Sequence, residues 1–140
     1  MPRKSASLMA SPRPADEKIT INVGCVDLGQ IDLLVQEGFY ANRTDLIRTA
    51  IRNQLAAQVD VVRQVASRKS LVLGIQHYGA ADLQATKAAG QMLQIRVLGL
   101  AVIAPDVTPA LALATIESIT VLGALHASPA VKAALSARIH

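Results

Sequence analysis

Residues 17–55 read EKITINVGCVDLGQIDLLVQEGFYANRTDLIRTAIRNQL, a short alternating segment followed by two segments with helical periodicity. The six residues after Glu17 alternate polar and apolar side chains, which predicts a β-strand with one apolar face. A lone strand leaves its backbone N–H and C=O groups unpaired. The simplest partner is the same strand of a second copy. The sequence therefore predicts an antiparallel two-stranded ribbon across a two-fold axis.

Two helices are expected after the strand, because apolar residues recur there at helical spacing. Asp27 is the expected N-cap of the first helix, and Gly38 suits the position just past its end, where a left-handed backbone favours glycine. The second helix is expected to open at Asn42, with Asp45 three residues later completing a capping box. Its apolar stripe predicts a helix that continues to about Ser67.

This order of elements resembles the ribbon–helix–helix repressors of the CopG, Arc and MetJ type. The resemblance rests on KITINV for the strand and on GFYANRTDLIRTAIRNQL for the turn and the second helix, and it covers residues 17–57. It implies an intertwined homodimer that binds double-stranded DNA and regulates transcription, and we expect a repressor.

The resemblance assigns base reading in the DNA major groove to Lys18, Thr20 and Asn22, which lie on the polar face of the predicted strand. Their chemistry suits this role. Lysine donates to guanine O6 and N7, asparagine can bind adenine through two hydrogen bonds, and threonine offers a hydroxyl and a methyl group.

The resemblance also implies a phosphate contact at the start of the second helix. There it falls to Asn42, Arg43 and Thr44. The unpaired N–H groups and the dipole of a helix N-terminus favour an anion, and Arg43 would add a direct charge contact.

The composition is mildly basic, with a net charge of +4 and a sequence pI near 9.6. Residues 1–69 carry 10 basic and 7 acidic side chains, against 4 and 3 in residues 70–140. The three aromatic residues are too few for a platform that stacks single-stranded bases. Cys25 is the only cysteine, so a reducing cytoplasm is expected. We expect no signal peptide and no membrane span.

A tripeptide repeat marks the second half of the chain. Val-Leu-Gly occurs at residues 72–74, 97–99 and 121–123, spaced by 25 and 24 residues. Each copy sits in a strand-like run that precedes an alanine-rich, helix-like segment. These segments are Ala80–Gln91, Thr108–Glu117 and Ser128–Ile139. Strand–helix units of nearly constant length predict parallel strands with the helices on one side of a small sheet.

Taken together, the sequence predicts an α+β protein: a ribbon–helix–helix dimer followed by an α/β domain of three β-α repeats. The expected organisation is a flexible basic arm over 1–16, a DNA-binding domain over 17–57, a helical extension over 58–69 and the repeat domain over 70–140. The repeat domain has few charges to protect its sheet edges, so we expect it to self-associate into oligomers larger than a dimer.

Neither a metal site nor a catalytic site is expected. His77, His126 and His140 are isolated in sequence, although the first two would come together if their strands were neighbours. The acidic residues of the second half are not spaced for catalysis with a base, and no phosphate-binding loop is present. We therefore expect no enzyme activity, no cofactor and no small-molecule ligand.

Two other functions remain open. The chain could be the antitoxin of a toxin–antitoxin pair, with its second half masking a partner protein. It could also be an assembly or scaffold protein in which the repeat is the main functional part and DNA binding is secondary. The repeat itself could also be a chance recurrence within an ordinary α/β domain.

Overall fold

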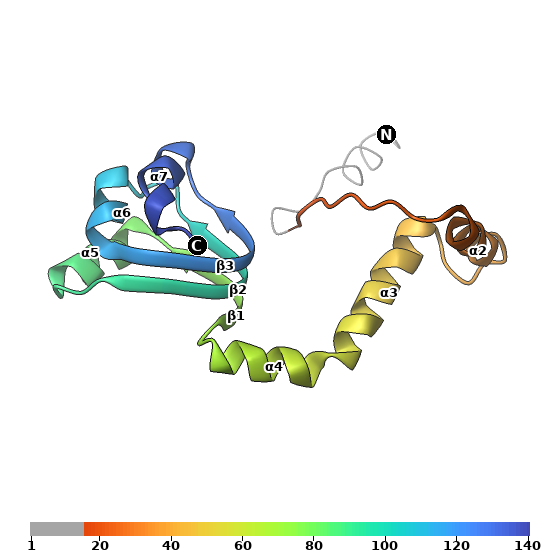
Figure 1. The fold of residues 1–140 in the computed structure, drawn as a ribbon. Coiled ribbons are helices and arrows are strands. Elements are labelled where there is room, and N and C mark those ends of the chain that lie inside the picture. The colour runs from red at the N-terminus through yellow and green to blue at the C-terminus, as the bar shows by residue number, and fades with distance from the viewer. Residues whose placement is uncertain (1–15) are drawn as a thin grey trace. The chain divides into compact units, whose positions relative to one another are not determined.

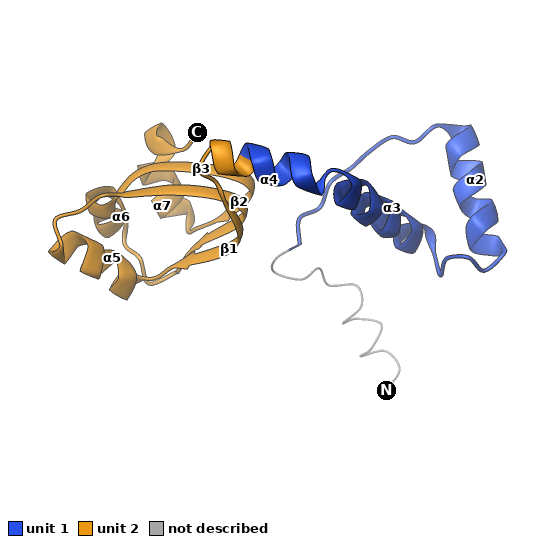
Figure 2. Ribbon diagram, turned by 90° about the horizontal axis from the view of Figure 1, so that it is seen from below, with its two compact units in different colours: residues 1–65 blue, residues 66–140 orange. Residues whose placement is uncertain are grey.

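The computed structural model describes residues 16–140 and divides the chain into two compact units, residues 1–65 and 66–140 (Figures 1 and 2). The expected basic arm lies outside the described residues except for Asp16. The fold is mixed helix and strand, as predicted.

Unit 1 begins with an extended segment, residues 16–24, that is assigned to neither helix nor strand (Figure 1). Helices α2 (Cys25–Gln36) and α3 (Arg43–Ala57) follow, and α4 (Val59–Arg68) leads into unit 2. In the described part of the chain no strand pairs with the extended segment. The predicted strand is therefore not formed within one chain, and the two-chain ribbon stays a prediction.

The prediction that Asp27 caps α2 is wrong. The N-cap is Gly24, whose backbone is extended (φ −60°, ψ 149°) and whose carbonyl accepts from Leu28 N at 2.9 Å. The chain is helical from Cys25 onward, so Asp27 lies in the first turn, where a carboxylate complements the helix dipole.

The predicted continuous helix to about Ser67 is interrupted once. At Gln58 the backbone reaches φ −105° and ψ 8°, and the Gln58 N–H donates to Leu55 O at 3.1 Å, an i to i−3 bond in place of the α-helical i to i−4 bond. Helix α3 ends there and α4 continues to Arg68, so the predicted end was nearly right.

Unit 2 consists of three strand–helix repeats, which confirms the prediction for this half. Their bounds are β1 (Val72–Tyr78), α5 (Ala80–Ala88), β2 (Leu93–Ile103), α6 (Pro109–Thr115), β3 (Ile116–His126), α7 (Pro129–Ala134) and a final 3-10 turn η1 (Ser136–Arg138). The three strands form one parallel sheet in the order β1-β2-β3.

The Val-Leu-Gly copies stand side by side across this sheet, with Gly74 paired to Gly99 and Gly99 to Gly123. All three glycines have positive φ, at 129°, 137° and 120°. A Cβ added at Gly99 would collide with the carbonyl oxygen of Gly74, and one at Gly123 with that of Gly99. The glycines of the second and third copies therefore have a structural role, because no other residue fits this close approach of neighbouring backbones.

Helices α6 and α7 start as the sequence indicates, at a hydroxyl residue followed by proline. Thr108 Oγ1 accepts from Leu111 N, and Ser128 Oγ accepts from Val131 N, each at 3.2 Å. The helices end earlier than predicted. The stretch expected to be helical up to Glu117, for example, already becomes strand β3 at Ile116.

Unit 2 has a closed apolar core between its helices and one face of its sheet. Leu83 of α5 and Val131 of α7 pack with Ile95, Val97 and Ile119 of the strands, and all five are at most 1% exposed. The helices therefore cover the same sheet face, and burial of this apolar surface stabilises the unit.

Candidate nucleic-acid interface

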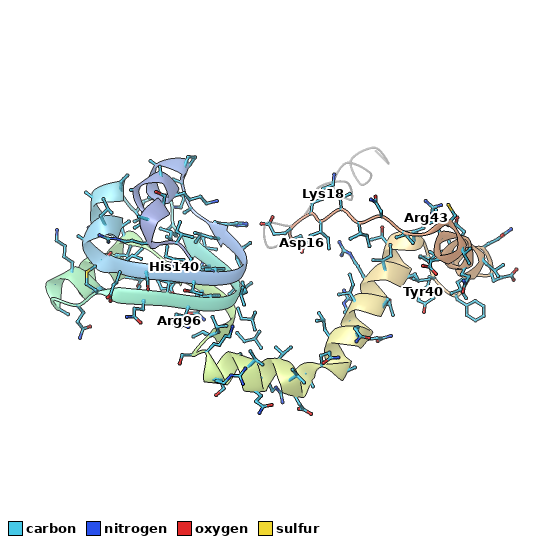
Figure 3. All side chains as sticks on the ribbon, viewed as in Figure 1. Asp16, Lys18, Tyr40, Arg43, Arg96 and His140 are labelled. Atoms are coloured by element: carbon cyan, nitrogen blue, oxygen red, sulfur yellow. The ribbon has the colours of Figure 1, made fainter. Side chains whose placement is uncertain are left out.

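The extended segment of unit 1 carries the three predicted base-reading residues. Lys18, Thr20 and Asn22 are all exposed, and Figure 3 shows Lys18 projecting from this segment. The apolar residues between them are exposed as well, with Ile19 at 76% and Ile21 at 64%. A segment with a polar and an apolar face, both open to solvent, has the pattern of a strand without a neighbouring strand.

The two helices that follow have no core of their own. No residue of α2 or α3 is buried. Large apolar side chains on these helices and on the turn between them remain exposed, among them Val26, Leu33, Phe39, Ile51 and Leu55. This amount of uncovered apolar surface is unusual for a unit that folds alone, and it marks an interaction surface.

The turn between the helices is fixed by a glycine, as predicted. Gly38 has φ 84°, its N–H donates to Val35 O at 3.1 Å, and the N–H of Phe39 donates to Leu34 O at 3.0 Å. These two bonds form a Schellman motif, which satisfies the last carbonyls of α2. The motif sets the direction in which the chain enters α3.

The start of α3 is capped by the residues that the sequence indicated. Asn42 Oδ1 accepts from Asp45 N at 2.8 Å. Asp45 Oδ2 accepts from Ala41 N at 2.9 Å, one residue earlier than the expected capping box would place this bond. The N–H groups of Arg43 and Thr44 lie in the first turn, where helix geometry provides no acceptor within the helix.

Arg43 is held by an acidic residue of α2. Its Nε donates to Asp32 Oδ1 at 2.7 Å and its Nη2 donates to Asp32 Oδ2 at 2.9 Å, with both side chains about half exposed. The hydrogen bonds and the charge of Arg43 hold the pKa of the Asp32 carboxyl below its ordinary value. The same pairing raises the pKa of Arg43, so both groups stay charged near neutral pH.

Asp32 is the one residue of this site that sequence reasoning missed. It lies eleven residues before Arg43, on the other side of a helix end and a turn. No spacing rule within a single helix links two such positions. Once the Schellman turn at Gly38 is recognised, however, an acid on α2 and a base at the start of α3 become candidates for a pair.

Strand β2 separates His77 from His126. His77 on β1 and His126 on β3 pair with the same residue of β2, Val102, which lies between them. The idea that they approach each other within one chain is therefore wrong. Among residues 16–140 no three His, Cys, Asp or Glu side chains gather in a group that could hold a metal ion.

No helix within residues 16–140 is both long and apolar enough to cross a membrane. No curated protein and no solved structure matches the chain. One family model does match, that of the ribbon-helix-helix transcriptional regulators, over residues 14–132. The match extends well beyond residues 17–57, where the resemblance was noted, and includes all three strands of unit 2. The chain belongs to the ribbon-helix-helix transcriptional regulator family, a class that is typically not enzymatic.

Proposed function

We propose that this protein is a homodimeric, sequence-specific regulator of transcription that reads the DNA major groove with a two-stranded ribbon. The observation that carries the proposal is the extended segment, whose residues 18–23 have no strand partner in the described part of the chain and whose polar and apolar faces are both exposed. Family membership supplies the DNA-binding class. The two-stranded ribbon and the base-reading roles of its residues are what we propose in addition.

A second copy of the chain resolves both deficits of unit 1 at once. Two antiparallel copies of residues 18–23 would pair the backbone groups along their facing edges. Ile19 and Ile21 would then face the apolar sides of α2 and α3 of both chains, where Leu33, Ile51 and Leu55 are now exposed. Burial of one such side chain contributes about 1.5–3 kcal/mol, so a few of them suffice to stabilise the dimer.

In this dimer six polar side chains, two copies each of Lys18, Thr20 and Asn22, point away from the helices. A two-stranded ribbon fits the major groove, where each base pair presents a distinct pattern of donors and acceptors. Lys18 suits guanine and Asn22 suits adenine. Thr20 suits either a hydrogen-bond partner or the methyl group of thymine.

The start of α3 is proposed as the phosphate contact, with a separate role for each residue. Thr44 and the backbone N–H groups of the first turn would donate to the phosphate, and Asn42 would hold that turn in place through its cap. Arg43 uses two of its five donors on Asp32, so the remaining N–H groups would reach the phosphate with the guanidinium already fixed in orientation.

Unit 2 is proposed to join such dimers into larger oligomers. Linked dimers on adjacent half-sites bind through a high effective concentration, which suits a repressor that occludes a promoter. The folded core of unit 2 favours this role over that of an antitoxin, because ribbon–helix–helix antitoxins typically bind their partner proteins with short disordered tails. A DNA target and a single free cysteine agree with a cytoplasmic location.

Replacing Lys18, Thr20 and Asn22 by alanine tests the proposal. We expect the triple variant to bind a site selected from random DNA more weakly, by about tenfold or more per lost contact. Its circular dichroism spectrum and the number of chains in its assembly should stay unchanged. The matched control is Lys87→Ala, which removes an exposed lysine of unit 2 and should bind as the unaltered protein does. Unchanged binding of the triple variant in a gel-shift assay would overturn the assignment.

A further inference from the structure

The two outer edges of the unit 2 sheet are open over matching lengths. On β3 the first part of the outer edge is covered, because Ile139 forms a parallel bridge to Ile119 and the His140 N–H donates to Ile119 O at 2.8 Å. From Val121 to Leu125 no strand of the described chain lies on that side. In register, this open stretch corresponds to residues 72–76 of β1, whose own outer edge is open as well.

Neither edge carries the features that normally prevent strand pairing. The stretches VLGIQHY of β1 and VLGAL of β3 contain no proline and no Lys, Arg, Asp or Glu. Their apolar side chains remain accessible, with Leu73 at 65%, Ile75 at 53% and Leu122 at 53% exposed. Edges of this kind are templates for addition of another strand.

Gly74, Gly99 and Gly123, which pair across the sheet and are called the glycine column below, indicate which edge can pair with which. Gly99 and Gly123 adopt positive φ where a Cβ would meet the carbonyl oxygen of the glycine on the preceding strand. Gly74 has the same backbone conformation, yet no atom lies within 4 Å of the position that its Cβ would take. Gly74 thus lies at an open edge with space for the carbonyl oxygen of a neighbouring strand, the group that Gly99 and Gly123 already contact within the chain.

We propose that β1 of one copy adds in parallel to β3 of another copy, with Gly74 seated against the carbonyl oxygen of Gly123. The register would continue that of the sheet, so that Val72 faces Val121 and Ile75 faces Ala124 of the other copy. This inference rests on the self-association proposed above for unit 2 and gives that association a geometry.

The contact is heterologous, because it joins two different edges. Each addition leaves one β1 edge and one β3 edge open at the ends of the assembly, so the contact builds a ring or a chain of copies. It also extends the rows of exposed leucines on the sheet face opposite the helices, since Leu73 would stand beside Leu122 of the next copy.

Disulfide trapping tests the register directly in the full chain. In a Cys25→Ser background, Ile75→Cys and Ala124→Cys are combined. Within one chain β2 lies between these positions, about 10 Å apart at two strand spacings, which exceeds the reach of a disulfide. Across the proposed contact the two positions are about 4.8 Å apart. We expect disulfide-linked dimers and larger species on a non-reducing gel after mild oxidation.

Two controls make this experiment decisive. Leu73→Cys with Ala124→Cys is two residues out of register, and we expect at least tenfold slower linkage. Ile75→Cys alone and Ala124→Cys alone should give no linked species. Linkage in the single variants would show that copies meet through equivalent surfaces, such as the open sheet face, and would overturn the proposal. Equal linkage in and out of register, or none at all, would do so too.

A second test uses two glycines that are alike within the chain. Gly74 and Gly90 both have positive φ and open space around the position of a Cβ. We expect Gly74→Ala to abolish species larger than a dimer in light scattering, and Gly90→Ala to retain them. Retention in both variants contradicts the proposal, and should Gly74→Ala fail to fold, the trapping result decides.

The outcome is separable from that for DNA binding. The Lys18, Thr20 and Asn22 triple alanine variant should keep the disulfide linkage when the cysteine pair is added. Linkage without specific DNA binding by the otherwise unaltered protein would sink the proposed function and leave the strand addition standing. Specific binding without linkage would do the reverse.

Discussion

The two units of this chain differ in what each can bury by itself. Unit 2 closes a core around Leu83, Ile95 and Ile119, each of them inaccessible to solvent. In unit 1 no residue of α2 or α3 is buried, and the segment before them has no sheet partner in the described chain. A strand–helix repeat supplies its own neighbouring strands along the chain, whereas in the proposed dimer unit 1 takes its second strand and the rest of its core from another copy.

The largest effect is expected in unit 2, from Gly99→Ala. The new methyl group would collide with the carbonyl oxygen of Gly74, and φ of 137° is strained for alanine. We expect a loss of about 3 kcal/mol or more, measured by chemical unfolding. Gly29→Ala is the control, because nothing lies within 4 Å of its Cβ position in α2. A gain of about 0.5–1 kcal/mol is expected there. Equal effects would contradict the structural role of the repeat.

The next largest effect separates the units. Ile21→Asp places a charge on the apolar face of the extended segment, which the proposed dimer buries. We expect α2 and α3 to lose their protection in hydrogen exchange, because a buried unpaired charge is strongly unfavourable. Protection of β2 should persist. Thr20→Asp adds the same charge one position along, on the opposite face, and should keep α2 and α3 protected. Equal protection in both variants would remove the case for a two-chain core.

The sequence predicted unit 2 more completely than unit 1, and the reason is physical. Three copies of one tripeptide align the three strands in a single register. Two of the helices that follow start at a hydroxyl residue, Thr108 or Ser128, with proline next in the chain. Helix ends were harder to place in both units, and the helices of unit 2 end before their predicted last residues. The N-cap at Gly24 and the break at Gln58 each depend on small differences between local backbone states, which no single side chain dictates.

For the candidate site, the sequence located the capped start of α3 but not the state of its arginine. Asn42 is the cap, as predicted. The pairing of Arg43 with Asp32 needs the path of the chain through the turn, because the two residues approach only once both helices are placed. The separation of His77 and His126 likewise follows from the strand order, which places β2 between their strands.

A smaller effect compares equivalent caps in the two units. Asn42→Ala removes the acceptor for Asp45 N at the start of α3, and Ser128→Ala removes that for Val131 N in α7. Each should cost about 1 kcal/mol. In the proposed dimer α3 packs against the second chain, so we expect Asn42→Ala to lower the dimer affinity as well, measured by sedimentation at low concentration. An unchanged dissociation constant would argue that α3 is stable without its partner.

The smallest effect is the pH dependence of the Asp32 to Arg43 pair. The pKa of Asp32 is lowered in the folded chain, so its contribution to stability is present above the ordinary pKa of an aspartate, about 4, and is lost as the pH falls through the lowered value. Asp32→Asn should therefore flatten the acid limb of a thermal stability curve and change little at pH 2. Both side chains are exposed, so a small difference is expected. Identical curves for both proteins would show that the pair contributes nothing.

The glycine column also bears on how such a protein can change in length. The Cβ positions of Gly99 and Gly123 each meet the backbone of the neighbouring strand alone, so this contact involves one adjacent strand and not the number of strands in the sheet. Tandem duplication of a segment of 24 or 25 residues would insert a fourth strand whose own glycine falls into line. A single duplication could thus lengthen unit 2, because the added repeat would use the same contact between neighbouring strands.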